Sequence, residues 1–118
     1  MSIPAINDIK EKLSSLRTDL DSLQQSQKNL FGYCQKLQEA YDRLSRQTEI
    51  LVRLINGAGS QQQLLLATRA MQEMQMGFNS QFLMLQNKIS HENRQFSMIS
   101  NIMKNKHDTA KNSINNIR

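Results

Sequence analysis

The sequence is poor in the residues that build compact globular cores. Its 118 residues include one Pro, four Gly, two Tyr, four Phe and no Trp. Gln, Leu, Ser, Asn, Met and Lys dominate instead, and this balance favours helix over strand. The composition argues against a sheet and favours long helices over a compact fold.

Further absences exclude whole classes of protein. Cys34 is the only cysteine, so the chain can form no internal disulfide. No apolar run approaches the roughly 20 residues that a membrane-spanning helix needs. The first residues, Met1-Ser2-Ile3-Pro4, lack the basic and apolar regions of a cleavable signal peptide. We therefore expect synthesis in the cytoplasm, with any export following a route that leaves the N-terminus uncut.

Motifs for catalysis, cofactors and metals are also missing. Gly57-Ala58-Gly59 lacks the preceding strand and the following Lys of a phosphate-binding loop. His91 and His107 each lack a second ligand at helical spacing, since the adjacent Glu92 and Asp108 point elsewhere on a helix. We expect no enzymatic activity, no cofactor and no metal site.

A heptad repeat of apolar residues runs through the first half of the chain. Alternate steps of three and four residues from Ile6 to Ile55 meet mostly apolar side chains, with polar residues between them. This pattern is typical of a coiled-coil helix. The residues predicted to form the seam within a hairpin are Leu13, Leu16, Leu20, Leu23, Leu30, Leu37, Tyr41, Leu44 and Leu51.

The repeat breaks at Asn56-Gly57-Ala58-Gly59-Ser60, where glycines can take the positive φ that ends a helix. Ser60 and Gln63 then have capping-box spacing, with each side chain able to bond the backbone N–H of the other. We predict helices at about 5–56 and 61–113, and a turn at 56–60. The predicted fold is a single all-α domain, residues 1–118, forming a long antiparallel helical hairpin.

The second helix carries a wider apolar stripe, and six of the seven methionines lie in it. Gly77 lies in this stretch and predicts close approach of another backbone; Gly32 in the first helix suggests the same. One partner helix cannot cover the stripe, so we expect self-association or a helical partner, with pairing inside one chain and domain swapping both open. The predicted partner-binding residues are Met71, Met74, Phe78, Phe82, Leu85, Ile89, Phe96 and Ile99.

The formal charge of +5 is uneven along the chain. Residues 1–59 carry eight Lys/Arg against seven Asp/Glu, and residues 60–118 carry seven against three. Because the basic residues of the C-terminal part are spaced apart and not clustered, we expect no nucleic-acid binding.

Several short segments of the second half stand out: Thr68-Arg69-Ala70-Met71-Gln72-Glu73-Met74-Gln75-Met76, Phe82-Leu83, Ile89-Ser90, Asn93 and Ser97-Met98-Ile99-Ser100. They resemble the inner-rod proteins of bacterial type III secretion systems. Residues that resemble the related needle subunits are Gln86, Lys88, Asn101, Lys104, Ile114, Asn116 and Arg118. The resemblance covers residues 64–118 at most, and the heptad-rich first helix is longer than these families need.

This resemblance implies a small helical subunit that is exported without a cleaved signal and polymerises around a channel through its C-terminal helix. Its partners would be further copies of itself or other helical proteins of a secretion complex. The alternative is a coiled-coil adaptor or export chaperone that binds one helical protein, which suits the long first helix.

Overall fold

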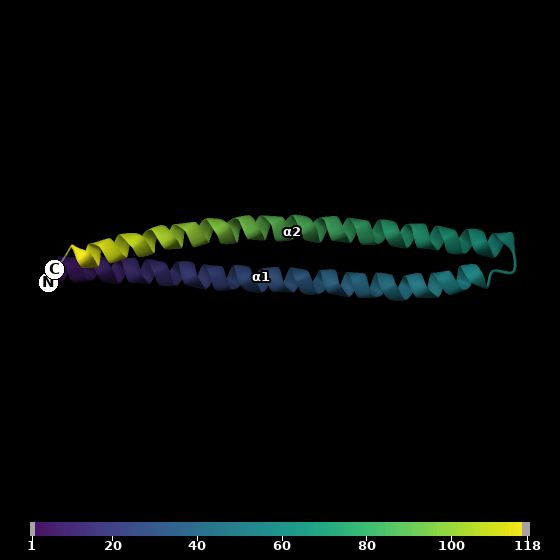
Figure 1. Cartoon of the computed structure of the whole chain (residues 1–118), viewed down its shortest axis with the longest axis horizontal. Coiled ribbons are helices and arrows are strands. Elements are labelled where there is room, and N and C mark those ends of the chain that lie inside the picture. The colour runs from purple at the N-terminus through teal and green to yellow at the C-terminus, as the bar shows by residue number, and fades with distance from the viewer. Residues whose placement is uncertain (1, 117–118) are drawn as a thin grey trace. The chain divides into compact units, whose positions relative to one another are not determined.

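The computed structural model describes residues 2–116 and is an all-α helical hairpin (Figure 1). Helix α1 spans Ile3–Asn56 and helix α2 spans Gln61–Asn115. The described residues form no strand. The predicted fold class is confirmed, and the helices begin and end within two residues of the expected positions.

The turn after α1 closes without a left-handed residue. The Gly57 N–H donates to the Arg53 carbonyl oxygen at 2.9 Å, and the Ala58 N–H donates to that of Ile55 at 3.3 Å. No described glycine has a positive φ, so the expected left-handed geometry is wrong. A Cβ on Gly57 would lie 3.3 Å from the Arg53 carbonyl oxygen. Glycine therefore helps here because it removes crowding at the helix end.

The start of α2 is capped by a variant of the expected Ser60–Gln63 capping box. The Ser60 hydroxyl accepts the Gln63 N–H at 3.2 Å, as predicted. The Gln63 side chain, however, accepts the N–H of Gly59 at 2.9 Å, one residue earlier than the predicted Ser60 N–H. One backbone donor of the turn and one of the first turn of α2 are therefore satisfied by side chains.

The chain divides into two compact units. Unit 1 comprises Met1–Phe31 with Ser90–Arg118, and unit 2 comprises Gly32–Ile89. Within each unit a segment of α1 runs antiparallel to a segment of α2. The predicted domain of residues 1–118 thus contains two units, each with its own contact face.

The contact face of unit 2 is apolar and aromatic. Leu85 is only 2% exposed, and Ala40 is equally buried. The Tyr41 ring lies 5.0 Å from the Phe78 ring and 6.5 Å from the Phe82 ring, measured between centroids. Such tilted aromatic pairs add about 0.5–1.5 kcal/mol to the gain from burial. Apolar packing therefore holds this unit together.

The contact face of unit 1 is mixed. Leu23 and Ala110 are buried, but so are Ser26 and Glu92, at 3% and 7% exposure. The Asn29 side-chain amide donates to Glu92 Oε1 at 3.3 Å, and this bond crosses from α1 to α2. Buried polar groups contribute little net stability even when paired. Unit 1 is therefore the less tightly held of the two.

Candidate functional site: helix-association surfaces

Large apolar side chains stay exposed along both helices. The described residues bury only five apolar side chains, and three of these are alanines: Leu23, Ala40, Ala67, Leu85 and Ala110. In unit 1 the exposed large apolar residues are Ile3, Ile6, Leu13, Leu20, Phe31, Met98, Ile102 and Ile114. In unit 2 they are Tyr41, Ile50, Val52, Leu54, Leu64, Leu65, Leu66, Met76, Leu83 and Met84. The candidate site is therefore a set of surfaces for further helices.

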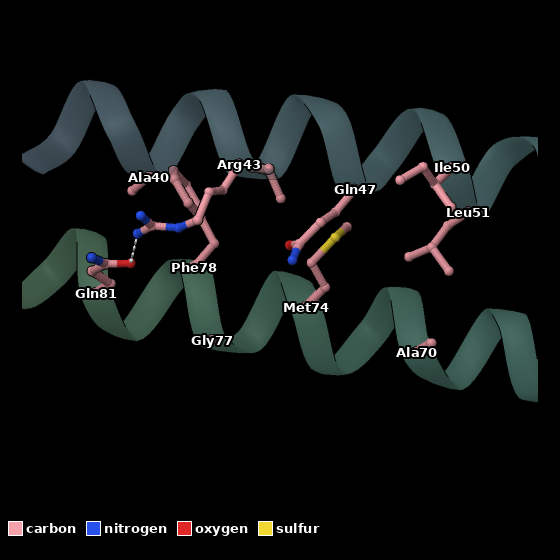
Figure 2. A pocket seen from close by; sticks show the side chains of 11 residues that line it. Ala40, Arg43, Gln47, Ile50, Leu51, Ala70, Met74, Gly77, Phe78 and Gln81 are labelled. Carbon is pink, nitrogen blue, oxygen red and sulfur yellow. Dashed lines mark hydrogen bonds between the residues drawn. The ribbon is translucent and has the colours of Figure 1, made fainter.

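One groove in unit 2 lies between the two helices and has a volume of about 590 Å³. Its lining includes the small residues Ala40 on α1 and Gly77 and Ala70 on α2, with Ala40 and Ala70 toward opposite ends (Figure 2). Figure 2 shows Gln47 and Met74 reaching toward each other across the interhelical space. At one end of this view the Arg43 guanidinium donates to Gln81 Oε1 at 3.2 Å.

Gly77 borders open space. A Cβ built on it would meet nothing within 4 Å, and the same holds for Gly32. The close backbone that the sequence suggested is thus not part of this chain. Any helix that approaches Gly77 closely would have to come from another molecule.

Unit 1 carries a second groove with a basic rim, here called the basic groove, of about 520 Å³. Its floor is apolar, with Leu13 at 54% and Leu20 at 46% exposure. Its charged residues are Arg17 and Lys104, and no carboxylate lines it. The full lining is Leu13, Leu16, Arg17, Leu20, Ser100, Met103, Lys104 and His107.

A third groove, of about 440 Å³ and also within unit 1, is here called the Glu11 groove. Its lining is Asp8, Glu11, Lys12, Ser15, Ile102, Asn105, Lys106 and Thr109. Lys12 Nζ lies 2.9 Å from an oxygen of Asp8, and Lys106 Nζ lies 2.8 Å from an oxygen of Asp19. Glu11 is the one charged lining residue that makes no ion pair among the described residues.

The residues predicted to bind a partner lie instead on the face of α2 that contacts α1. Leu85 is buried, and the other seven are neither buried nor fully exposed. Phe78 and Phe82, for example, pack on Tyr41 of the same chain. In this hairpin the set contributes to the internal contact face: Met71, Met74, Phe78, Phe82, Leu85, Ile89, Phe96 and Ile99.

Only part of the predicted seam of α1 lies on the face that contacts α2. Six of its nine residues lie on the contact face: Leu16, Leu23, Leu30, Leu37, Leu44 and Leu51. Leu13, Leu20 and Tyr41 are exposed at roughly half their surface, and the preceding residues Lys12, Asp19 and Ala40 are more buried than they are. Tyr41 still packs one side of its ring on Phe78 and Phe82. Lys12 and Asp19 are favoured there because α2 supplies Ser113 at 2.6 Å and Lys106 at 2.8 Å.

Sequence reasoning missed the charged residues of the two unit 1 grooves. A signal was available in the spacing, because Arg17 falls four residues after Leu13 and three before Leu20 on one helical face. Lys104 and His107 repeat that spacing on α2. The two flanks of unit 1 differ in their charged residues, and a search for apolar periodicity does not detect this difference.

Other chemistry is sparse within residues 2–116. No group of three His, Cys, Asp or Glu residues is placed to hold a metal ion there. Cys34 is a free, exposed thiol, and His91 bonds to the Gln95 side chain one turn away at 3.1 Å. Neither described helix has an apolar stretch long enough to cross a membrane.

No protein-family model matches the chain, and neither a curated protein nor a solved structure is significantly similar to it.

Proposed function

We propose that this chain is a structural, self-assembling helical subunit of a bacterial protein secretion apparatus, of the type III rod or needle kind. Two lines of reasoning support the proposal. The segments between Thr68 and Ser100 resemble inner-rod proteins, and the hairpin leaves apolar surface that further helices could cover.

The observation that carries the self-assembly is the small apolar core. Full burial of one Leu or Ile side chain is worth about 1.5–3 kcal/mol. Association costs roughly 4–15 kcal/mol of lost freedom, so a contact needs several such side chains. The hairpin exposes enough of them in each unit, for example Leu64, Leu65 and Leu66 beside the turn. Lateral packing of copies would bury them.

The test is the molar mass of the protein in solution as a function of concentration. Light scattering should show assemblies that grow with concentration, and an exposed apolar-to-charged substitution, Leu83→Glu, should weaken them. Phe82 is unsuitable for this purpose, because it packs inside the hairpin and its replacement would disturb the fold itself. A monodisperse monomer at high concentration that also fails to bind other secretion components would refute the proposal.

A second candidate function is an adaptor or export chaperone that holds one helical protein. The unit 2 groove favours it, because Gly77 and Ala70 leave room for a helix against α2. This function predicts a complex of fixed stoichiometry and protection of residues 70–81 from proteolysis only when the partner is present. Assemblies that grow with concentration would argue for the first function instead.

A further inference from the structure

We propose that parallel copies of this chain associate side by side through unit 1. The basic groove on one flank of a copy receives the Glu11 groove on the opposite flank of the next copy. This inference rests on the self-assembly proposed above and specifies the surfaces that would carry it.

The charges of the two grooves are complementary. Arg17 and Lys104 give the basic groove two cations with no lining carboxylate. In the Glu11 groove both lysines are engaged by Asp8 and Asp19, which leaves the Glu11 carboxylate available to a neighbour. An arriving Glu11 would therefore find cations that have no acidic residue beside them in the groove.

The apolar parts of the two grooves are complementary as well. Leu13 and Leu20 lie one beyond the other along α1 and line the basic groove with Met103. Ile102, 42% exposed, lines the Glu11 groove. Covering the flank of one copy that exposes Leu13 and Leu20 with the flank of another that exposes Ile102 would bury apolar surface that the isolated hairpin leaves in water.

The two grooves lie on opposite flanks of unit 1. Glu11 and Leu13 are two residues apart, which turns their side chains roughly 200° from each other on a helix. Ile102 and Lys104 have the same spacing on α2. A contact between these grooves therefore leaves one free groove on each outer side, where a further copy can join.

Charge also selects this arrangement over a symmetric dimer. Two basic grooves face to face would oppose Arg17 and Lys104 to the same residues, and like charges placed together disfavour this pairing. Two Glu11 grooves face to face would bring no unengaged lysine to Glu11, because Lys12 and Lys106 already pair with Asp8 and Asp19. A contact between two different surfaces does not close a dimer, so it extends into a ring or an open array.

The two grooves lie at different positions along the helix axes, and this shift favours an open array over a closed ring. The α1 residues of the Glu11 groove, 8–15, lie five positions before those of the basic groove, 13–20. The α2 residues are shifted by two positions in the corresponding direction, 102–109 against 100–107. At about 1.5 Å per residue, parallel copies would be displaced by roughly 3–8 Å at each contact. Repetition of this step produces an open, staggered stack.

The test is a charge exchange between two variants, Arg17→Glu and Glu11→Lys. In Arg17→Glu the new carboxylate meets Glu11 of the neighbour, and in Glu11→Lys the new cation meets Arg17 and Lys104, so the concentration needed for half-assembly should rise at least about tenfold in each variant. In an equal mixture the Glu at position 17 of one variant meets the Lys at position 11 of the other. The unchanged Arg17 and Glu11 form the remaining contact. Assembly should therefore return in the mixture, as measured by sedimentation of the full chain.

The control is Arg94→Glu, an exposed reversal of the same charge in unit 1 that lines neither groove. It should assemble like the unchanged protein, and helix content by circular dichroism should be equal in all variants. If both groove variants assemble normally, or their mixture does not recover, this interface is wrong while self-assembly stands. If the unchanged protein never assembles, the proposed function itself fails.

Discussion

Lys106 Nζ lies 2.8 Å from Asp19 Oδ2 and thereby joins α2 to α1 inside unit 1. The pair is close enough for an ion pair, yet its geometry is not that of a hydrogen bond, so this buried oxygen of Asp19 has no hydrogen-bond donor. The cation is more than one-third exposed at its side chain, so solvent screens part of the attraction. The pair sets the alignment of the two helices more than it stabilises them.

This pair leads to a prediction about stability. Replacing both partners, Asp19→Leu with Lys106→Leu, should leave the free energy of unfolding unchanged or raise it by about 1–2 kcal/mol, because apolar side chains can fill the same position without desolvated charge. Lys106→Leu alone should lower it, because it leaves the Asp19 carboxylate without its cation. Urea unfolding of the single and double variants measures the difference. A double variant much less stable than the single one would contradict this account.

Leu85 is the most deeply buried large side chain, so its truncation should have the largest effect in unit 2. Leu85→Ala should lower the free energy of unfolding by about 2–4 kcal/mol, because it removes buried methyl groups and leaves a cavity. Leu83→Ala is the matched control, since Leu83 is exposed two residues away. Its effect should stay within roughly 0.5 kcal/mol under conditions where the protein is monomeric.

Ser60 should be needed for the stability of the turn. Ser60→Ala removes the acceptor of the Gln63 N–H and should cost about 1 kcal/mol. Ser80→Ala gives the opposite sign, because Ser80 is exposed within α2 and alanine has the higher helix propensity. Thermal unfolding followed by circular dichroism compares the two, and equal shifts would show that the Ser60 cap contributes nothing.

Gly77 separates the two candidate functions. Gly77→Ala should raise the free energy of unfolding by up to about 1 kcal/mol, because the added methyl group meets nothing within 4 Å and alanine favours helix. If a partner helix packs closely at this position, the same substitution should weaken that complex. Stability and partner affinity measured on one protein sample should then change in opposite directions. Unchanged affinity would place the partner elsewhere.

Much of the fold could be predicted from the sequence because the helical signals are strong and local. The break at Gly57 and Gly59, the cap at Ser60 and the spacing of Phe82, Leu85 and Ile89 each depend on neighbours along the chain. The contact face of α2 from Phe78 onward follows the predicted stripe, because no second apolar stripe of equal regularity competes with it.

The contact face of α1 was less predictable, because two neighbouring stripes were available. One contains Leu13, Leu20 and Tyr41, and the other contains Lys12, Asp19 and Ala40. Hydrophobicity alone favours the first. In unit 1 the second turns inward because Ser113 lies opposite Lys12 and Lys106 lies opposite Asp19, and that complementarity depends on the alignment of residues about a hundred positions apart. The charged grooves on either flank follow from the same rotation: the spacing of Arg17 places it on one helical face with Leu13 and Leu20, but only the rotation leaves that face exposed.

The contrast between the two contact faces also sets the order in which the two units unfold locally. Unit 2 is closed by aromatic and apolar packing, whereas unit 1 buries the polar side chains Ser26 and Glu92. Backbone amides near Leu85 should therefore exchange with solvent hydrogen more slowly than those near Leu23 or Ala110. Opening of unit 1 would thus precede opening of unit 2.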